Sequence, residues 1–194
     1  MHDLPSPTSV SHLLRRRASI FPAMYTDEPV DEAVIHELLE NANWAPNHKK
    51  TEPWRFTVIR GDARRRLADF LGDTYRRVTP AADFSEKKHQ KLATNPTKAD
   101  TVIAICMQRD PEERLPEWEE LAAVAMAVQN LWLTATAHGL GGYWSSPGLI
   151  NHLGPFLNLG EGERCLGLFY LARHRAPELP RTRGDIAEKV TWME

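Results

Sequence analysis

Hydrophobic positions along the chain repeat with two different periods, and these periods predict both helices and strands. The clearest helical pattern spans residues 116–138, where apolar side chains recur at intervals of three and four. Asp31 and Ser85 stand where N-caps are expected, and Gly139 stands where a helix commonly ends. Further helices are predicted over 12–17, from Asp31 to about Trp44, over 62–78, from Ser85 to Asn95, and around 149–157.

Four shorter segments have the composition and spacing of β-strands. Residues 54–58 alternate between apolar and polar side chains, and residues 101–107 form a β-branched apolar run. Strands are also predicted near 140–145 and over 164–172. A chain rich in helices with about four strands is typical of an α+β fold.

The length and the two ends of the chain suggest its organisation. A chain of 194 residues is the size of one domain, so residues 1–194 are expected to form a single domain. Residues 1–10 are polar and lack the apolar core of a signal peptide, which predicts a flexible arm and a cytoplasmic protein. The C-terminal extension, 177–194, cannot close a core of its own. Such an extension commonly wraps a partner subunit, which indicates a dimer.

Composition excludes several classes of function. The 24 Lys and Arg residues against 26 Asp and Glu residues give a net charge of −2, which argues against a dedicated nucleic-acid-binding protein. The longest apolar runs are far shorter than a membrane span. Cys106 and Cys165 lie in apolar, strand-like segments and are expected to be buried thiols.

Several familiar catalytic and binding motifs are missing from the sequence. The glycines of 139–142 follow a helix, whereas the glycines of a dinucleotide fingerprint follow a strand and open a helix. The histidines lack the paired spacing of metal ligands, and no C-x-x-C or G-x-S-x-G motif occurs. No metal site is therefore expected.

Two segments carry candidate binding chemistry. The run from Arg15 to Ser19 is either a solvated basic helix end or an anion clamp, because guanidinium groups bind phosphate in a bidentate manner. The loop over 44–56 holds Asn, His, Lys and Glu side chains between two prolines and two tryptophans. A rigid loop with many polar groups is a typical place for ligand contacts.

In these segments the sequence resembles the nitroreductase family of FMN-dependent oxidoreductases, over nearly the whole chain. The resemblance rests on four motifs in the right order. They are Arg17-Ala18-Ser19, then Ala45-Pro46-Asn47-His48 leading to Glu52-Pro53-Trp54-Arg55-Phe56, then Gly139-Leu140-Gly141-Gly142-Tyr143-Trp144, and the tail Pro180-Arg181-Thr182-Arg183 followed by Val190-Thr191-Trp192. The small size and the Ala-Pro-Asn-His variant suggest the compact branch of the family.

The resemblance implies a nitroreductase-like α+β fold, with a central mixed sheet flanked by helices and a C-terminal extension that wraps the partner. It also implies a homodimer with two FMN molecules at the subunit interface. Trp44 and His48 would lie against the cofactor from the other subunit. The other cofactor-binding residues implied are Arg17, Ala18, Ser19, Tyr143, Trp144, Ser145, Arg181 and Arg183.

The chemistry implied is that of a flavoprotein in which FMN, and no catalytic side chain, carries the hydride. NADH or NADPH would reduce FMN, and a flat acceptor such as a nitroarene or quinone would then be reduced in a ping-pong cycle. Two alternatives are a flavin enzyme with a narrow acceptor, such as an enone or a halogenated aromatic, and a flavin-binding module without turnover. A third is a helical interaction protein without flavin. The sequence departs from the common pattern at Ala18, Trp44 and Glu52.

Overall fold

A four-stranded sheet forms the centre of the computed structural model, which describes residues 4–178 and 181–194. The strands are β1 (Trp54–Ile59), β2 (Thr101–Gln108), β3 (Gly141–Ser145) and β4 (Glu163–Ala172), in the order β1-β2-β4-β3. All four lie where the sequence predicts them. Every strand pair is antiparallel, which corrects the mixed sheet that the resemblance implied. Outside the four strands, Ser19 forms an isolated parallel bridge with Gly142.

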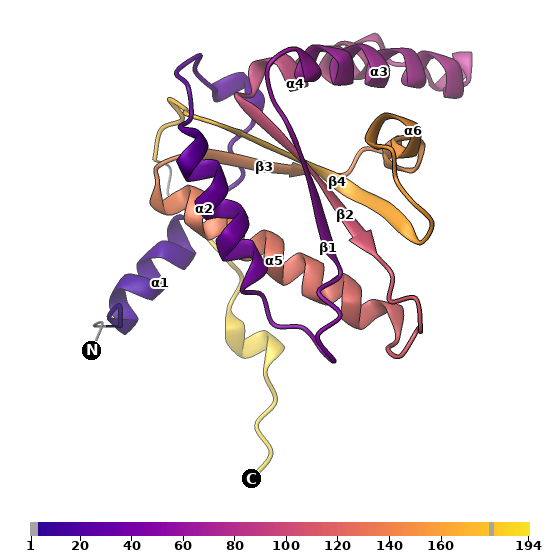
Figure 1. Ribbon diagram of the computed structural model, residues 1–194. Coiled ribbons are helices and arrows are strands. Elements are labelled where there is room, and N and C mark those ends of the chain that lie inside the picture. The colour runs from indigo at the N-terminus through magenta and orange to yellow at the C-terminus, as the bar shows by residue number, and fades with distance from the viewer. Residues whose placement is uncertain (1–3, 179–180) are drawn as a thin grey trace.

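Helices cover both faces of this sheet (Figure 1). On one face, α2 (Glu32–Asn43) packs against α5 (Glu117–Ala137), and the core between them and the sheet includes Leu38, Leu131 and Phe169. The other face is covered by α3 (Asp62–Val78), α4 (Glu86–Lys98) and the short α6 (Gly154–Leu157). Its core includes Leu71 and Leu168. An antiparallel sheet with helices packed on both faces is an α+β fold, as the sequence predicts.

The N-terminal helix begins earlier than the sequence pattern predicts. Helix α1 spans Pro7–Arg16, and the Oγ of Ser6 accepts a hydrogen bond from the N–H of Ser9 at 3.1 Å. Pro7 occupies the first helical position, where its missing N–H costs nothing. The predicted arm over 1–10 is therefore wrong for residues 7–10, and residues 1–3 lie outside the described part of the chain.

Two proline positions also differ from the expectation. Helix α4 continues through Pro96 to Lys98. A proline this close to the C-terminal end of a helix removes only one backbone hydrogen bond, and burial of the Pro96 ring offsets that loss. The helix predicted around 149–157 is divided into a 3-10 turn (Ile150–His152) and α6. Pro155 explains the division, since it has no N–H to donate and fits only the first turn of a helix.

Helix α5 positions the edge strand of the sheet. Gly139 ends it with a φ of 68°, as predicted, and the N–H of Leu140 donates to the carbonyl of Ala135 at 2.9 Å. The chain then enters β3 directly, so that β3 lies beside the C-terminal half of α5.

Gly167 of β4 provides space that no other residue type would leave. Its φ is 152°, and a Cβ atom there would lie 2.4 Å from Nε1 of Trp144 and 2.7 Å from the carbonyl oxygen of Ser145. We expect Gly167→Ala to lower the free energy of unfolding by about 1–3 kcal/mol, because both a clash and backbone strain are introduced. Urea denaturation measures the change. Gly148→Ala is the matched control, since a Cβ at Gly148 has no atom within 4 Å, and equal midpoints for the two variants would contradict the prediction.

The C-terminal extension leaves the body of the protein (Figure 1). Residues 181–194 are all exposed, including Trp192, and their one helical turn, Ile186–Lys189, is capped by the carboxylate of Asp185. The extension therefore gains little burial within its own chain. In the part of the chain that the structure describes, none of the helices has the length and apolar character needed to cross a bilayer.

Candidate functional site

The segment Arg17-Ala18-Ser19 lies along the open edge of β3. The N–H of Ile20 donates to the carbonyl of Gly142 at 2.9 Å, next to the bridge between Ser19 and Gly142. From the helix side, the indole N–H of Trp132 donates to the carbonyl of Ala18 at 3.2 Å. Two of the four sequence motifs, far apart in the chain, are thereby brought into contact.

Three guanidinium groups gather at this edge. The Arg17 guanidinium carbon lies 4.4 Å from the centre of the Trp132 ring, which is a cation–π contact. Burial, followed by the nearby positive charges of Arg183 and Arg181, lowers the pKa of Arg17 from its ordinary value. Within residues 4–178 and 181–194, no carboxylate forms an ion pair with any of the three. An uncompensated cluster of guanidinium groups is suited to binding an anion.

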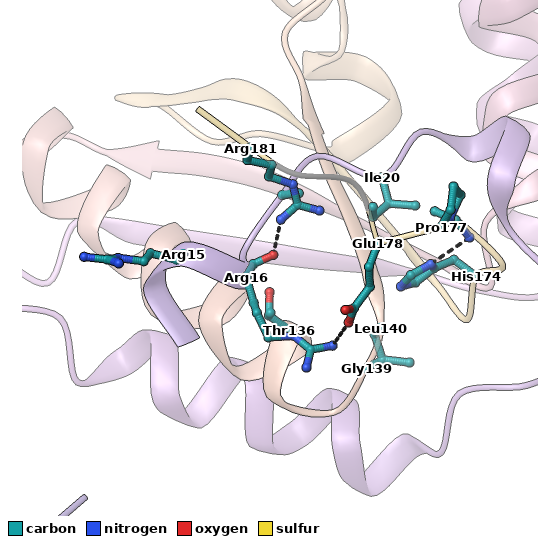
Figure 2. Close-up of a pocket in the computed structure, with 12 residues that line it drawn as sticks. Arg15, Arg16, Ile20, Thr136, Gly139, Leu140, His174, Pro177, Glu178 and Arg181 are labelled. Carbon is teal, nitrogen blue, oxygen red and sulfur yellow. Dashed lines mark hydrogen bonds and ion pairs between the residues drawn. The ribbon is translucent and has the colours of Figure 1, made fainter. Parts of the chain in front are cut away.

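The two arginines before Arg17 have other surroundings. They border a cavity of about 280 Å³ between the end of α1, the end of α5 and the start of the extension. Figure 2 shows Arg16 paired with Glu178, while Arg181 donates to the carbonyl of Arg16. Arg181, a member of the guanidinium cluster, thus ties the extension to the end of α1, whereas Arg15 points away from Arg181 in the same view.

The aromatic residues of β3 point to opposite faces of the sheet. Tyr143 stacks on Tyr170 with ring centres 6.0 Å apart and also contacts Phe21. Trp144 packs against the core beneath α2 and α5. Side chains alternate along a strand, so Ser145 lies on the face of Tyr143, and the three predicted side chains do not converge. Tyr143, Trp144 and Ser145 can therefore contribute to one site only through their backbone groups.

The backbone of β3 presents polar groups at its open edge. Gly142 uses its outward carbonyl to pair with Ile20, and polar backbone groups alternate direction along a strand. The N–H of Trp144, two residues later, therefore also points toward this edge. A Cβ atom on Gly142 would lie 2.6 Å from Phe169 and 2.8 Å from Trp132, so the small residue here allows the close packing of the edge on α5.

The other two predicted residues lie elsewhere in the chain. Trp44 follows α2 and is 79% exposed, with its indole N–H donating to Glu40 at 3.3 Å. His48 lies beside the first turn of α5, where its Nδ1 is 2.8 Å from Oε2 of Glu119. Thirteen residues of helix, or about 20 Å, separate Glu119 from Trp132 along α5. One chain does not bring His48 to the guanidinium cluster.

Two residues near these positions have contacts that the sequence pattern does not predict. Trp132 fits the apolar face of its helix, and periodicity alone cannot show that its N–H reaches Ala18. Glu119 stands in an acidic first turn, where a favourable interaction with the helix dipole is sufficient reason for a carboxylate. In contrast, Glu52 is exposed, and its N–H donates to the side-chain oxygen of Asn47 at 3.2 Å.

Comparison with known proteins assigns the chain and its fold to a family. Residues 14–173 match the model of the nitroreductase family. The chain belongs to this family. The match covers every strand of the sheet and includes Arg17, whereas Arg181 and Arg183 lie in the extension beyond its end.

Individual relatives support the assignment. A Bacillus subtilis protein, YfhC, whose name places it among NAD(P)H nitroreductases, is 33% identical over 185 residues, covering 93% of this chain and 92% of its own. The nitrobenzene nitroreductase of Ectopseudomonas oleovorans is 32% identical over 168 residues, or 71% of this chain and 73% of that enzyme.

Solved structures extend the likeness. A nitroreductase-like family protein from Bacillus cereus has a TM-score of 0.79 and 28% identity, over 99% of this chain and 100% of that one. A nitroreductase-class protein from Desulfovibrio desulfuricans, solved in complex with FMN, has a TM-score of 0.73 and 28% identity, over 98% and 99% of the two chains.

Proposed function

We propose that this protein is an FMN-dependent NAD(P)H oxidoreductase that binds the phosphate of FMN with Arg17, Arg181 and Arg183. The observation that carries the proposal is the guanidinium cluster beside the open edge of β3. Burial and the nearby positive charges of Arg183 and Arg181 destabilise the charged form of Arg17 in the absence of an anion. A phosphate dianion neutralises that charge through short, charge-assisted hydrogen bonds.

The residues around the cluster fit the rest of the cofactor. Ala18 is small, which leaves room beside it for a flat ring, and the hydroxyl of Ser19 offers a hydrogen bond to a sugar alcohol or to phosphate. The backbone N–H of Trp144 is a donor for a ring nitrogen or oxygen. FMN supplies the hydride chemistry when bound, while these residues bind and orient it.

A homodimer completes the proposed site. Trp44 and His48 reach the cofactor from the second subunit, since neither lies near the guanidinium cluster of its own chain. Exposed apolar side chains on α5, namely Trp118, Leu121 and Met126, provide a surface for the partner. The extension, 177–194, wraps the second subunit, where its exposed Trp192 becomes buried.

The proposed cycle is ping-pong, with NADH or NADPH as donor and a nitroaromatic, quinone or similar flat molecule as acceptor. An acceptor that stacks on the exposed ring takes the place of the nicotinamide, so both use one site in turn. The similarity to a nitrobenzene nitroreductase supports acceptors of this class. A narrow acceptor, or flavin binding without turnover, are the alternatives that the same cofactor site permits.

The visible spectrum of the purified protein tests this proposal. We expect a yellow protein whose flavin absorbance bleaches anaerobically with NADH or NADPH and returns when an acceptor is added. A yellow protein that neither donor bleaches would instead be a passive flavin-binding module. A colourless protein that does not bind added FMN would overturn the proposal as a whole.

A further inference from the structure

His48 and Glu119 form a specific pair at the N-terminal end of α5. The Nδ1 of His48 lies 2.8 Å from Oε2 of Glu119, and a carboxylate can only accept, so Nδ1–H is the donor. The two other acidic residues of this turn have partners of their own. Glu117 pairs with Arg164, and the buried Glu120 pairs with Arg109. Glu119 is thus the carboxylate of this turn that is directed at the histidine.

The pair lies on the wall of an open, largely apolar groove of about 550 Å³. Trp118, Ala122 and Met126 of α5 line the groove together with Pro46. Lys49, next to His48, donates from its Nζ to the carbonyl of Arg114 at 3.2 Å, which ties the loop that carries His48 to the segment just before α5. Trp118 and Met126 also belong to the surface proposed for the partner, so a flat aromatic molecule against these apolar walls would lie between the two subunits. The His48–Glu119 pair is the main hydrogen-bonding feature of the groove.

A carboxylate on Nδ1 determines what the other ring nitrogen can do. With Nδ1–H committed to Glu119, Nε2 is the atom left to exchange a proton with a bound molecule. The ring is 61% exposed while Glu119 is 25% exposed, so the histidine remains accessible to a ligand and to water, while its partner is the more firmly held of the two.

We propose that Glu119 is a positioning residue that holds His48 so that Nε2 delivers a proton to the oxygen of the electron acceptor. This inference rests on the proposed function, because it requires a partner's flavin to meet the acceptor beside His48. It concerns acceptors that bear an oxygen atom, such as quinones and nitroarenes.

The proton balance of the reaction creates a need for such a group. A quinone becomes a hydroquinone by gaining two electrons and two protons. A hydride brings both electrons and one proton, so the second proton comes from an acid. When imidazolium gives up its Nε2 proton, neutral imidazole remains with Nδ1–H still bonded to Glu119, and water returns the proton. The geometry on the Glu119 side is the same before and after transfer.

Nuclear magnetic resonance of ¹⁵N-histidine-labelled protein tests the positioning directly and requires no cofactor. We expect neutral His48 to be the Nδ1–H tautomer in the wild type, and to change to the Nε2–H tautomer, which free imidazole side chains prefer, in Glu119→Ala. Glu119→Asp should partly restore the original tautomer. Glu117→Ala is the matched control from the same turn and should leave it unchanged. An Nε2–H tautomer in the wild type would overturn the inference.

Stopped-flow oxidation of the reduced holoenzyme tests the proton transfer. We expect Glu119→Ala to slow oxidation by a quinone by about tenfold or more, in proportion to the usual contribution of a general acid. Oxidation by ferricyanide, which takes electrons without protons, should keep its rate, as should reduction by NAD(P)H. Equal effects on quinone and ferricyanide, or no effect on either, would overturn the inference. A wild-type protein that binds no FMN would instead refute the proposed function.

Discussion

Replacing Arg17 by alanine is expected to weaken FMN binding by tenfold or more. A charge-assisted hydrogen bond to phosphate contributes about 1.5–3 kcal/mol, and Arg17 is the member of the cluster that is partly buried and fixed by Trp132. Its guanidinium group is therefore held in place before the ligand arrives. The dissociation constant is measured by titrating the apoprotein with FMN at constant ionic strength, with quenching of the flavin fluorescence as the signal.

Two further variants separate a specific phosphate contact from a general effect of charge. Arg65→Ala removes one positive charge from the exposed side of α3, away from the edge of β3, and should leave the affinity unchanged. Arg17→Lys keeps the charge but loses the planar fork, so its affinity should fall between those of the wild type and Arg17→Ala. Unchanged FMN retention in Arg17→Ala would remove this residue from the site.

Local sequence patterns are sufficient to predict most of the secondary structure. Asp31 caps α2 through a hydrogen bond from the N–H of Ala33 at 2.9 Å, as its position before an apolar repeat indicates. Gly139 adopts the positive φ that ends α5. The errors occurred where polar composition or proline was interpreted without its surroundings, as in residues 7–10 and at Pro96.

Long-range features of the site depend on contacts that no local pattern contains. The resemblance to a family placed Arg17 and Tyr143 near one ligand, and the structure confirms that their segments meet. The side chain of Tyr143 packs against Phe21 and Tyr170, on the opposite face of the sheet from Trp144, because side chains alternate along β3 and the two cores bury different faces. The partnership of His48 with Glu119 likewise joins a loop to a helix 71 residues later.

Mixing two inactive variants, one in Arg17 and one in His48, is expected to restore activity. Under the proposed function each site takes Arg17 from one subunit and His48 from the other. Random exchange makes half of the dimers hybrid, and one of the two sites in each hybrid is intact. The mixture should therefore recover about one quarter of the wild-type activity per site, measured by NAD(P)H oxidation with a quinone.

Isolated hybrid dimers distinguish a site shared between subunits from a site built within one subunit. Two different affinity tags on the variants allow the hybrid to be isolated, and the hybrid alone should have about half of the wild-type activity, since one of its two sites is intact. The double variant Arg17→Ala with His48→Ala, mixed with wild type, is the matched control. Its hybrids lack one component in each site, so that they should have no active site at all. An inactive isolated hybrid of the two single variants would show that Arg17 and His48 do not act across the interface, and the distance along α5 between Glu119 and Trp132 would then separate two unrelated sites.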